Sequence, residues 1–187
     1  MGYTMQHILA VDIGGRPFNW LHWQRVVQLY ARDEIAWETG TALYRIRGGI
    51  NRRTRRCSEI ELTSVVSIRG ANTAVVYQGP PSLSNRALFA RDGYLCMYCG
   101  SRFSVSMLTR DHVMPRAQGG RDDWENVITA CKSCNNHKGN RTPEQAGMPL
   151  LAIPYEPNHA EYLMIANRRI LADQMVFLRQ YLPRARR

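Results

Sequence analysis

The sequence has no long apolar segment, and this excludes several classes of protein. None of its apolar runs approaches the roughly 18 residues that a membrane-spanning helix needs. The first residues, MGYTMQHILAVDI, lack the basic segment followed by an apolar one that is typical of a secretory signal. Internal repeats and low-complexity tracts are also absent. We therefore expect a soluble, cytoplasmic protein with no membrane partner.

Acidic residues are scarce relative to basic ones. The 187 residues include 15 Asp+Glu against 25 Lys+Arg, which gives a formal net charge of +10 at pH 7. Hydrophobic residues make up 44% of the chain and charged residues 21%, an ordinary balance for a folded protein of one large or two small domains. The positive charge favours a polyanionic partner, because each phosphate that Lys or Arg neutralises releases condensed counterions. On charge alone, a nucleic acid, an anionic membrane and a merely solvated surface all remain open.

Cysteine is also rare, but its spacing is informative. Four of the five cysteines form two C-x-x-C pairs. Because we expect no export signal, we interpret the pairs as metal ligands rather than disulfides. Zinc prefers four soft or borderline ligands in a tetrahedron, and two such pairs supply four thiolates. The sequence therefore predicts a structural zinc site at Cys96, Cys99, Cys131 and Cys134. The remaining Cys57 is interpreted as a spectator thiol.

Turn residues divide the rest of the chain into short elements. Gly79-Pro80-Pro81-Ser82 is the best candidate for a boundary, because two prolines end helices and cannot donate ladder hydrogen bonds. A long helix is expected after Pro157, with Asn158 as its cap and Pro183 as its end. The other expected elements are a strand within 4–13, a helix at 20–30, short strands at 34–37, 42–46, 62–68 and 73–77, and a helix at 86–91.

A strongly basic segment lies at residues 45–56. It carries six arginines and the pair Gly48-Gly49, a pattern that predicts a loop or a hairpin. A DNA track is the interpretation we favour, and a solvated loop is the alternative. The candidate nucleic-acid contacts in this segment are Arg52, Arg53, Arg55 and Arg56.

The 31 residues between the cysteine pairs exceed the roughly 15–20 of a plain zinc ribbon. They contain TRDHVMPR at 109–116, QGG at 118–120 and WENV at 124–127, and NNHKGNR follows the second pair at 135–141. From about residue 86 to 148, this ordered combination resembles the HNH endonuclease family, in its zinc-knuckle-containing bacterial and phage subgroup. The resemblance implies a ββα-metal domain with a strand at 108–114, Gly119-Gly120 in the connection, a strand at 127–130 and a helix from near Cys134.

The resemblance also implies roles for individual residues. His112 would be the general base that takes a proton from the attacking water, which suits an imidazole because its unperturbed pKa is about 6.5. Asp111 and Asn135 would hold one Mg²⁺ or Mn²⁺ through oxygen atoms. His137 is the alternative ligand, because Asn135 stands where the family name calls for a second histidine. Asn126 would brace the loop and orient His112.

The expected substrate is DNA, cut to leave 5′-phosphate and 3′-hydroxyl ends. Candidate phosphate contacts near the site are Arg116, Lys138 and Arg141. Three alternatives stay open: a non-catalytic zinc-dependent nucleic-acid-binding module, a nuclease acting on RNA or branched DNA, and a redox protein that uses C-x-x-C. A homodimer is also left open, because cutting both strands with one site per chain favours two copies.

The predicted fold class is α+β, in three consecutive segments. Residues 1–82 form a small N-terminal α/β module for substrate recognition or assembly. Residues 83–150 form the zinc-stapled HNH nuclease domain, and residues 151–187 form a C-terminal helical extension. Any sequence preference is expected in the N-terminal module, because a ββα unit mainly contacts the nucleic-acid backbone.

Overall fold

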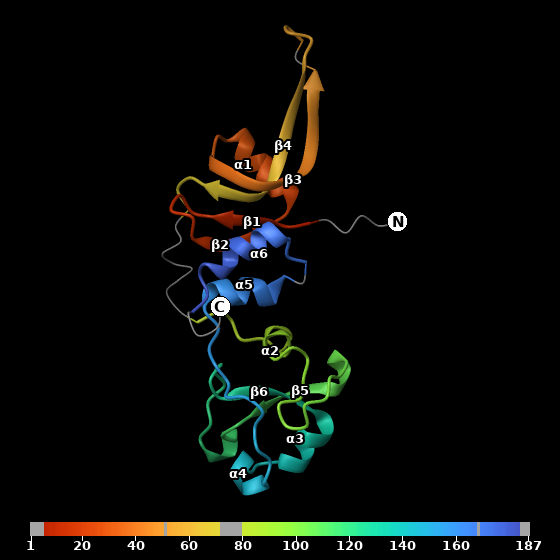
Figure 1. Ribbon diagram of the computed structural model, residues 1–187, viewed down its shortest axis with the longest axis vertical. Helices are drawn as coiled ribbons and strands as arrows, with labels where there is room; N and C mark the ends of the chain where they lie inside the picture. Colours follow the sequence, from red (N-terminus) through yellow and green to blue (C-terminus); the bar gives the residue numbers. More distant parts are fainter. Residues whose placement is uncertain (1–5, 51, 72–79, 168, 184–187) are drawn as a thin grey trace. The chain divides into compact units, whose positions relative to one another are not determined.

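The chain folds as a mixed α+β protein, described here by a computed structural model that covers residues 6–50, 52–71, 80–167 and 169–183 (Figure 1). Its contacts group into two compact units. The first unit contains residues 1–79 together with 159–187, and the second contains residues 80–158. The strand expected at 73–77 lies outside the described residues.

The first unit is built on a four-stranded sheet in the order β2-β1-β4-β3. Its strands are β1 (Ile8–Val11), β2 (Pro17–Leu21), β3 (Ile35–Ile50) and β4 (Cys57–Ile68). β1 runs antiparallel to β2 and parallel to β4, and β4 runs antiparallel to β3. All four residues of β1 are buried, because this central strand is covered on both faces.

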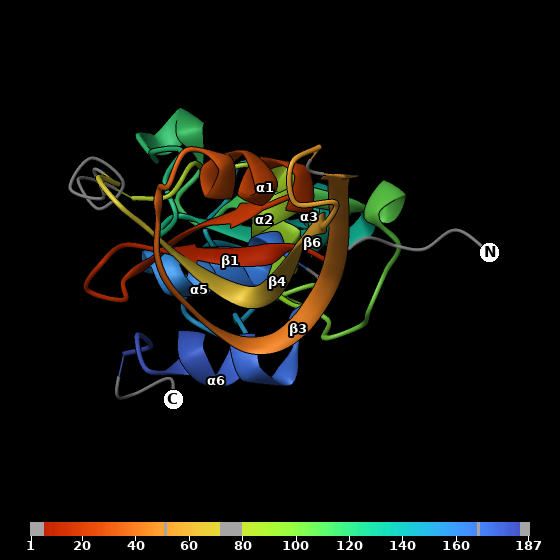
Figure 2. The same cartoon turned by 90° about the horizontal axis from the view of Figure 1, so that it is seen from above.

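Helices from distant parts of the sequence cover the two faces of this sheet (Figure 1 and Figure 2). Ile8 packs with Val26 of α1 (Trp23–Ala31) on one face. Leu9 packs on the other face against α5 (His159–Ala166) and α6 (Ala172–Arg179). The period of two along a strand explains why neighbouring residues of β1 meet different helices. The C-terminal segment thus completes the core of the N-terminal unit.

The helix expected at 20–30 begins only at Trp23, because Trp20 and Leu21 pair with β1 as part of β2. The two short strands expected at 34–37 and 42–46 are one strand, β3, with a register shift between Thr39 and Ala42. Gly40 makes this shift possible, since its φ is +90° and an added Cβ would lie 2.0 Å from the Ser64 hydroxyl.

The prediction of a single long C-terminal helix is wrong, because the segment forms the two helices α5 and α6. The Asn167 side chain accepts the backbone N–H of Arg169, and both of these residues lie outside the two helices. α6 then starts anew, with the Gln174 side chain accepting the backbone N–H of Leu171. Gln174 is fully buried and also donates to the carbonyls of His7 and Ser64, so α6 is held to the sheet by directional bonds.

The second unit contains a hairpin followed by a helix. β5 (Leu108–His112) and β6 (Val127–Cys131) pair antiparallel, and α3 (Lys132–Lys138) follows β6 directly. α2 (Asn85–Arg91) precedes this hairpin and α4 (Pro143–Ala146) follows α3. The Ser84 hydroxyl caps α2 at the backbone N–H of Ala87, and Thr142 caps α4 at Gln145. The strand expected at 108–114 ends at His112, and the helix expected near Cys134 begins at Lys132.

A buried arginine ties the parts of the second unit together. The Arg91 side chain is 1% exposed and forms an ion pair with Asp92 at 2.8 Å. Its guanidinium donates to the carbonyls of Trp124, Val127 and Tyr155 and lies over the rings of Trp124 and Tyr155. α2, the approach to β6 and the segment after α4 therefore meet at one side chain. Across the described residues of both units, no helix is long and apolar enough to cross a membrane.

Candidate active site

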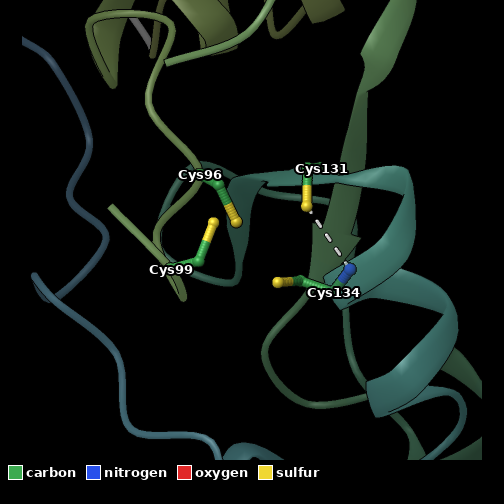
Figure 3. A group of neighbouring side chains, drawn as sticks. All are labelled: Cys96, Cys99, Cys131 and Cys134. Atoms are coloured by element: carbon green, nitrogen blue, oxygen red, sulfur yellow. Dashed lines mark hydrogen bonds between the residues drawn. The ribbon is translucent and has the colours of Figure 1, made fainter. Parts of the chain in front are cut away.

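Four cysteine thiols converge at one end of the second unit (Figure 3). The Sγ atoms of Cys96, Cys99, Cys131 and Cys134 all lie within 4.8 Å of one another, and none is in a disulfide. Cys96 and Cys99 come from the turn after α2, and Cys131 and Cys134 from the junction of β6 and α3. The backbone N–H of Ser101 holds the pKa of the Cys99 thiol at about 7. The cluster is compatible with zinc, because it supplies four soft donors from two tight turns.

A cavity of about 560 Å³ in the same unit gathers five of the predicted site residues. Asp111 and His112 reach it from the end of β5, and Asn135 reaches it from α3. Arg116 and Lys138 also line it. The remaining lining residues are Arg110, Pro115, Ala117, Asn136, Gly139 and Asn140. His137 and Arg141 are not among them.

The carboxylate of Asp111 is fixed from two sides. Asp111 is 5% exposed, and its Oδ2 atom accepts a 2.6 Å hydrogen bond from the hydroxyl of Tyr98. Its Oδ1 atom lies 3.0 Å from Nζ of Lys138, which also donates to the carbonyl of His112 at 2.8 Å. Burial and the neighbouring Asp111 carboxylate raise the pKa of Tyr98, so the phenol stays protonated and donates. Lys138 is only 1% exposed, so its ammonium acts on Asp111 rather than on solvent.

His112 is paired with an acid that the motifs did not identify. Its Nε2 atom lies 2.9 Å from Oδ1 of Asp122. Asp122 also accepts from Arg110 at 2.7 Å, and Arg110 donates in turn to the side chain of Asn85 at 2.9 Å. Hydrogen bonds from Arg110 and then from His112 hold the pKa of Asp122 below its ordinary value. At neutral pH Asp122 is thus an ionised acceptor beside the imidazole.

Asn126 holds the loop between the strands and does not line the cavity. Its Oδ1 atom accepts the backbone N–H of Met114 at 2.8 Å, and its Nδ2 atom donates to the carbonyls of Met114 and Arg121. In the same loop, the backbone of Gly120 passes so close to Met114 that a Cβ atom on Gly120 would lie 1.8 Å from the Met114 carbonyl oxygen. Asn126 and Gly120 together let the chain return close to the end of β5.

The residues after the second cysteine pair divide between the cavity and the surface. Nδ2 of Asn135 donates to the Thr109 hydroxyl at 2.9 Å, which leaves the carbonyl oxygen as the free end of the amide. His137 is exposed on α3. Arg141 donates to the carbonyls of Lys138 and His137, so its guanidinium caps the C-terminal end of α3.

Sequence reasoning missed Tyr98, Arg110 and Asp122. Tyr98 is one of the two residues between Cys96 and Cys99, and the C-x-x-C pattern assigns no role to these positions. Asp122 lies ten positions after His112 in a polar loop that also contains Asp123, and spacing does not identify which acid reaches the imidazole. Arg110 directly precedes Asp111 in β5. Successive side chains of a strand point to opposite faces, and this alternation is the sequence signal that could have assigned the two residues different roles.

Part of the second unit is similar in sequence to known proteins. Residues 96–141 match the profile of the HNH endonuclease family. They form an HNH endonuclease domain. The CRISPR-associated endonuclease Cas9 of Corynebacterium diphtheriae is 39% identical over 67 residues, which are 34% of this chain and 6% of that protein. The match thus spans a small fraction of that relative's length.

A solved structure of the Type II-C Cas9 enzyme from Actinomyces naeslundii is also similar to this chain. The two share 19% sequence identity over 58% of this chain and 12% of the other. Their TM-score is 0.30, a value too low to establish a shared fold.

Proposed function

We propose that the HNH domain hydrolyses phosphodiester bonds of DNA, with His112 as the general base and one divalent cation held by Asp111 and Asn135. The observation that supports this most is the convergence of all three side chains on one cavity from β5 and α3. The exposed Arg116 in the same wall provides a cation for a phosphate.

The pairing of His112 with Asp122 prepares the imidazole to accept a proton. Asp122 is ionised, so Nε2 carries the proton of their 2.9 Å hydrogen bond and Nδ1 is left as the basic nitrogen. Nδ1 takes a proton from water as the water oxygen attacks phosphorus, the bond from phosphorus to the 3′ oxygen breaks, and the leaving 3′ oxygen takes a proton from solvent water to become the 3′-hydroxyl. Asn126 is a positioning residue here, because it holds the loop that returns to His112 and makes no contact with the cavity.

The donor atoms around Asp111 fit a hard cation. A carboxylate and an amide carbonyl are the kind of oxygen ligands that Mg²⁺ or Mn²⁺ prefers. When bound, such an ion supplies positive charge to the scissile phosphate and the leaving oxygen. Tyr98 and Lys138 orient the Asp111 carboxylate from opposite oxygens, so its direction is set before the ion arrives.

The four clustered cysteines hold a structural zinc ion in this proposal. Tyr98 lies between Cys96 and Cys99, and its hydroxyl reaches Asp111 at 2.6 Å. One side chain therefore connects the zinc site with the carboxylate of the catalytic cation. Thiols of this kind stay reduced in the cytoplasm, which is where we place the protein.

DNA is the substrate we propose, because the chain carries a net charge of +10 and its relative from C. diphtheriae is described as an endonuclease. RNA and branched DNA are the alternative substrates.

Plasmid cleavage tests this proposal. Purified protein is incubated with supercoiled plasmid in Mg²⁺, in Mn²⁺ and without added divalent ion. We expect metal-dependent nicked or linear product from the wild type. His112→Ala should lower the rate at least about 100-fold, the usual size of general-base catalysis. Zinc content and circular dichroism verify that the variant is folded.

His137→Ala is the matched control, because it removes an exposed imidazole from α3 outside the cavity. We expect this variant to cleave like the wild type. Equal loss of activity in both variants would instead make His137 part of the metal site. Plasmid that is bound but uncut in every metal, by wild-type protein with full zinc content, would favour the non-catalytic binding module.

A further inference from the structure

Among the described residues, the outer part of the β3–β4 hairpin pairs with no other strand of the sheet. β1 meets β4 only at Val65, Val66 and Ser67, whereas the pairing of β3 with β4 continues to Ile50 and Cys57. Beyond the sheet the hairpin is a two-stranded ribbon, and Figure 1 shows it running past α1 and the other strands of its unit. The packing of the unit does not require a ribbon of this length.

Charge is distributed unevenly along this ribbon. Near the sheet, Arg45 lies 3.5 Å from Glu59 and 3.2 Å from Glu61, and Arg47 lies 3.8 Å from Glu59. These cross-strand pairs compensate the basic charge of the strands. On the other face of the ribbon, Ile46 and Ile60 pack against the core of the unit. The near half of the hairpin is thus an ordinary structural element.

The hairpin tip, residues 52–56, is different. Four of its five residues are arginines, and all five are exposed. Within the described part of the chain, Arg52, Arg55 and Arg56 have no acidic partner. Ile50, just before the tip, is 68% exposed, so no apolar contact explains why the ribbon extends this far.

One arginine of the tip has a backbone conformation that is unfavourable for its residue type. Arg55 has a φ of +56°, in the left-handed region where glycine or asparagine is accommodated at lower cost. An arginine at such a position is expected where its side chain has a use that offsets the strain.

We propose that the hairpin tip is a DNA-binding arm that enters the major groove of duplex DNA and holds its phosphates with Arg52, Arg55 and Arg56. The major groove of B-form DNA admits a two-stranded β-ribbon, whereas the major groove of duplex RNA is too deep and narrow for side chains to read. Arginine suits phosphate binding, because its guanidinium can form two parallel hydrogen bonds to phosphate oxygens. The inference rests on the proposed function only for the choice of DNA as partner.

This arm belongs to the first unit, whereas the cavity with His112 belongs to the second. Binding and hydrolysis are therefore separable by substitution. A tip variant loses affinity for DNA while its catalytic residues stay untouched, and a His112 variant keeps its affinity.

The test measures binding of a fluorescent 30-base-pair DNA duplex by anisotropy, over a range of salt concentrations. It uses the full chain carrying His112→Ala, in buffer without added Mg²⁺, so that no cleavage interferes. The tip variant is Arg52→Gln/Arg56→Gln. The matched control is Arg25→Gln/Arg32→Gln, which removes the same charge from exposed positions elsewhere in the first unit.

We expect the tip variant to bind at least tenfold more weakly and the control to change affinity less than threefold. Because log K falls as log[salt] rises, each lost phosphate contact should make this negative slope shallower by about 0.9. Equal losses in both variants would overturn the proposal, because net charge alone would then explain binding. Equally tight, tip-dependent binding of a duplex RNA of the same sequence would overturn the choice of DNA. Wild-type protein that binds DNA through the tip but cuts nothing would contradict only the proposed hydrolysis.

Discussion

Inside each of the two compact units, a different kind of contact stands out. The unit of residues 1–79 and 159–187 has a sheet with apolar side chains packed on both faces, and its central strand is buried throughout. In the unit of residues 80–158, the charged side chains of Arg91, Asp111 and Lys138 are almost fully buried, each in a defined set of hydrogen bonds. The second unit therefore adds buried ion pairs to its apolar core.

This difference indicates which unit needs atoms held at fixed positions. Apolar burial is non-directional and tolerates small shifts, which is sufficient for a scaffold. A site for a cation and a reacting phosphate needs oxygen and nitrogen atoms at fixed distances, and only directional contacts supply these. The second unit also has long irregular stretches around its short hairpin, so its shape depends on a few specific bonds.

Removing zinc is expected to produce the largest difference in stability between the two units. A chelator of high zinc affinity, or Cys131→Ser/Cys134→Ser, should abolish the fold of the second unit, because thiolate–metal bonds at the proposed zinc site would stabilise this unit. Hydrogen exchange followed by mass spectrometry should show loss of protection in β5, β6 and α3. β1 and β4 should stay protected.

Cys57→Ser is the control for this experiment, because Cys57 is exposed on the hairpin of the first unit. It should leave exchange unchanged in both units. Simultaneous loss of protection in β1 and β4 after zinc removal would contradict the comparison, since the two units would then depend on one another. Unchanged exchange in β5 and β6 would show that the cysteine cluster has no structural role.

The next largest effect is expected from Arg91→Met. This change leaves the Asp92 carboxylate buried without its ion pair and removes the donor to three backbone carbonyls. Breaking one side of a buried pair costs about 3–5 kcal/mol of stability. Denaturation in urea with zinc present measures this as a lower midpoint. Hydrogen exchange in β5 and β6 resolves the second unit, because tryptophan fluorescence would also report Trp20, Trp23 and Trp37 of the first unit.

Arg86→Met is the matched change for Arg91→Met, since Arg86 is an exposed arginine of the same helix α2. We expect it to alter stability by less than about 0.5 kcal/mol. A similar destabilisation by both substitutions would mean that α2 itself, and not the buried ion pair, determines the stability of this unit.

The same contrast explains which features the sequence predicts. The cysteine cluster and the meeting of Asp111, His112 and Asn135 in one cavity follow from short motifs whose spacing fixes local geometry. Asp122 and Tyr98 come to the site through a loop path and a side-chain length that spacing does not encode. The roles of all these residues stay predictions until cleavage is measured.

In the first unit, sequence periodicity identifies apolar strands but not their partners. The pairing of β1 with β4 joins residues more than 50 positions apart, and the side chain of Gln174 bonds to carbonyls of both segments. The predicted continuous C-terminal helix failed because contact with the sheet favours two shorter helices over one. Tertiary contacts of this kind override local propensity and leave no local pattern.

The smallest effect is expected at Asp173, a carboxylate of the first unit that accepts hydrogen bonds from a hydroxyl and from a backbone N–H. Desolvation opposes its ionisation, but hydrogen bonds from the Ser64 hydroxyl at 2.6 Å and the Thr41 backbone N–H at 2.7 Å outweigh it and lower the pKa of Asp173 to about 2. Because the folded pKa is below the ordinary value of 3.8, this group stabilises the fold above about pH 4. The contribution is lost as the pH falls through about 2.

Asp173→Asn should therefore lower the free energy of unfolding by about 1–2 kcal/mol at pH 7 and by progressively less as the pH falls below about 4. Urea denaturation at several pH values measures the difference, with Asp33→Asn as the control because the Asp33 side chain is 93% exposed in the same unit. A difference that stays constant down to pH 2 would assign the effect to the shape of the side chain rather than to its charge. The first unit would then hold no stabilising ionised carboxylate at this position, and the contrast with the second unit would become sharper.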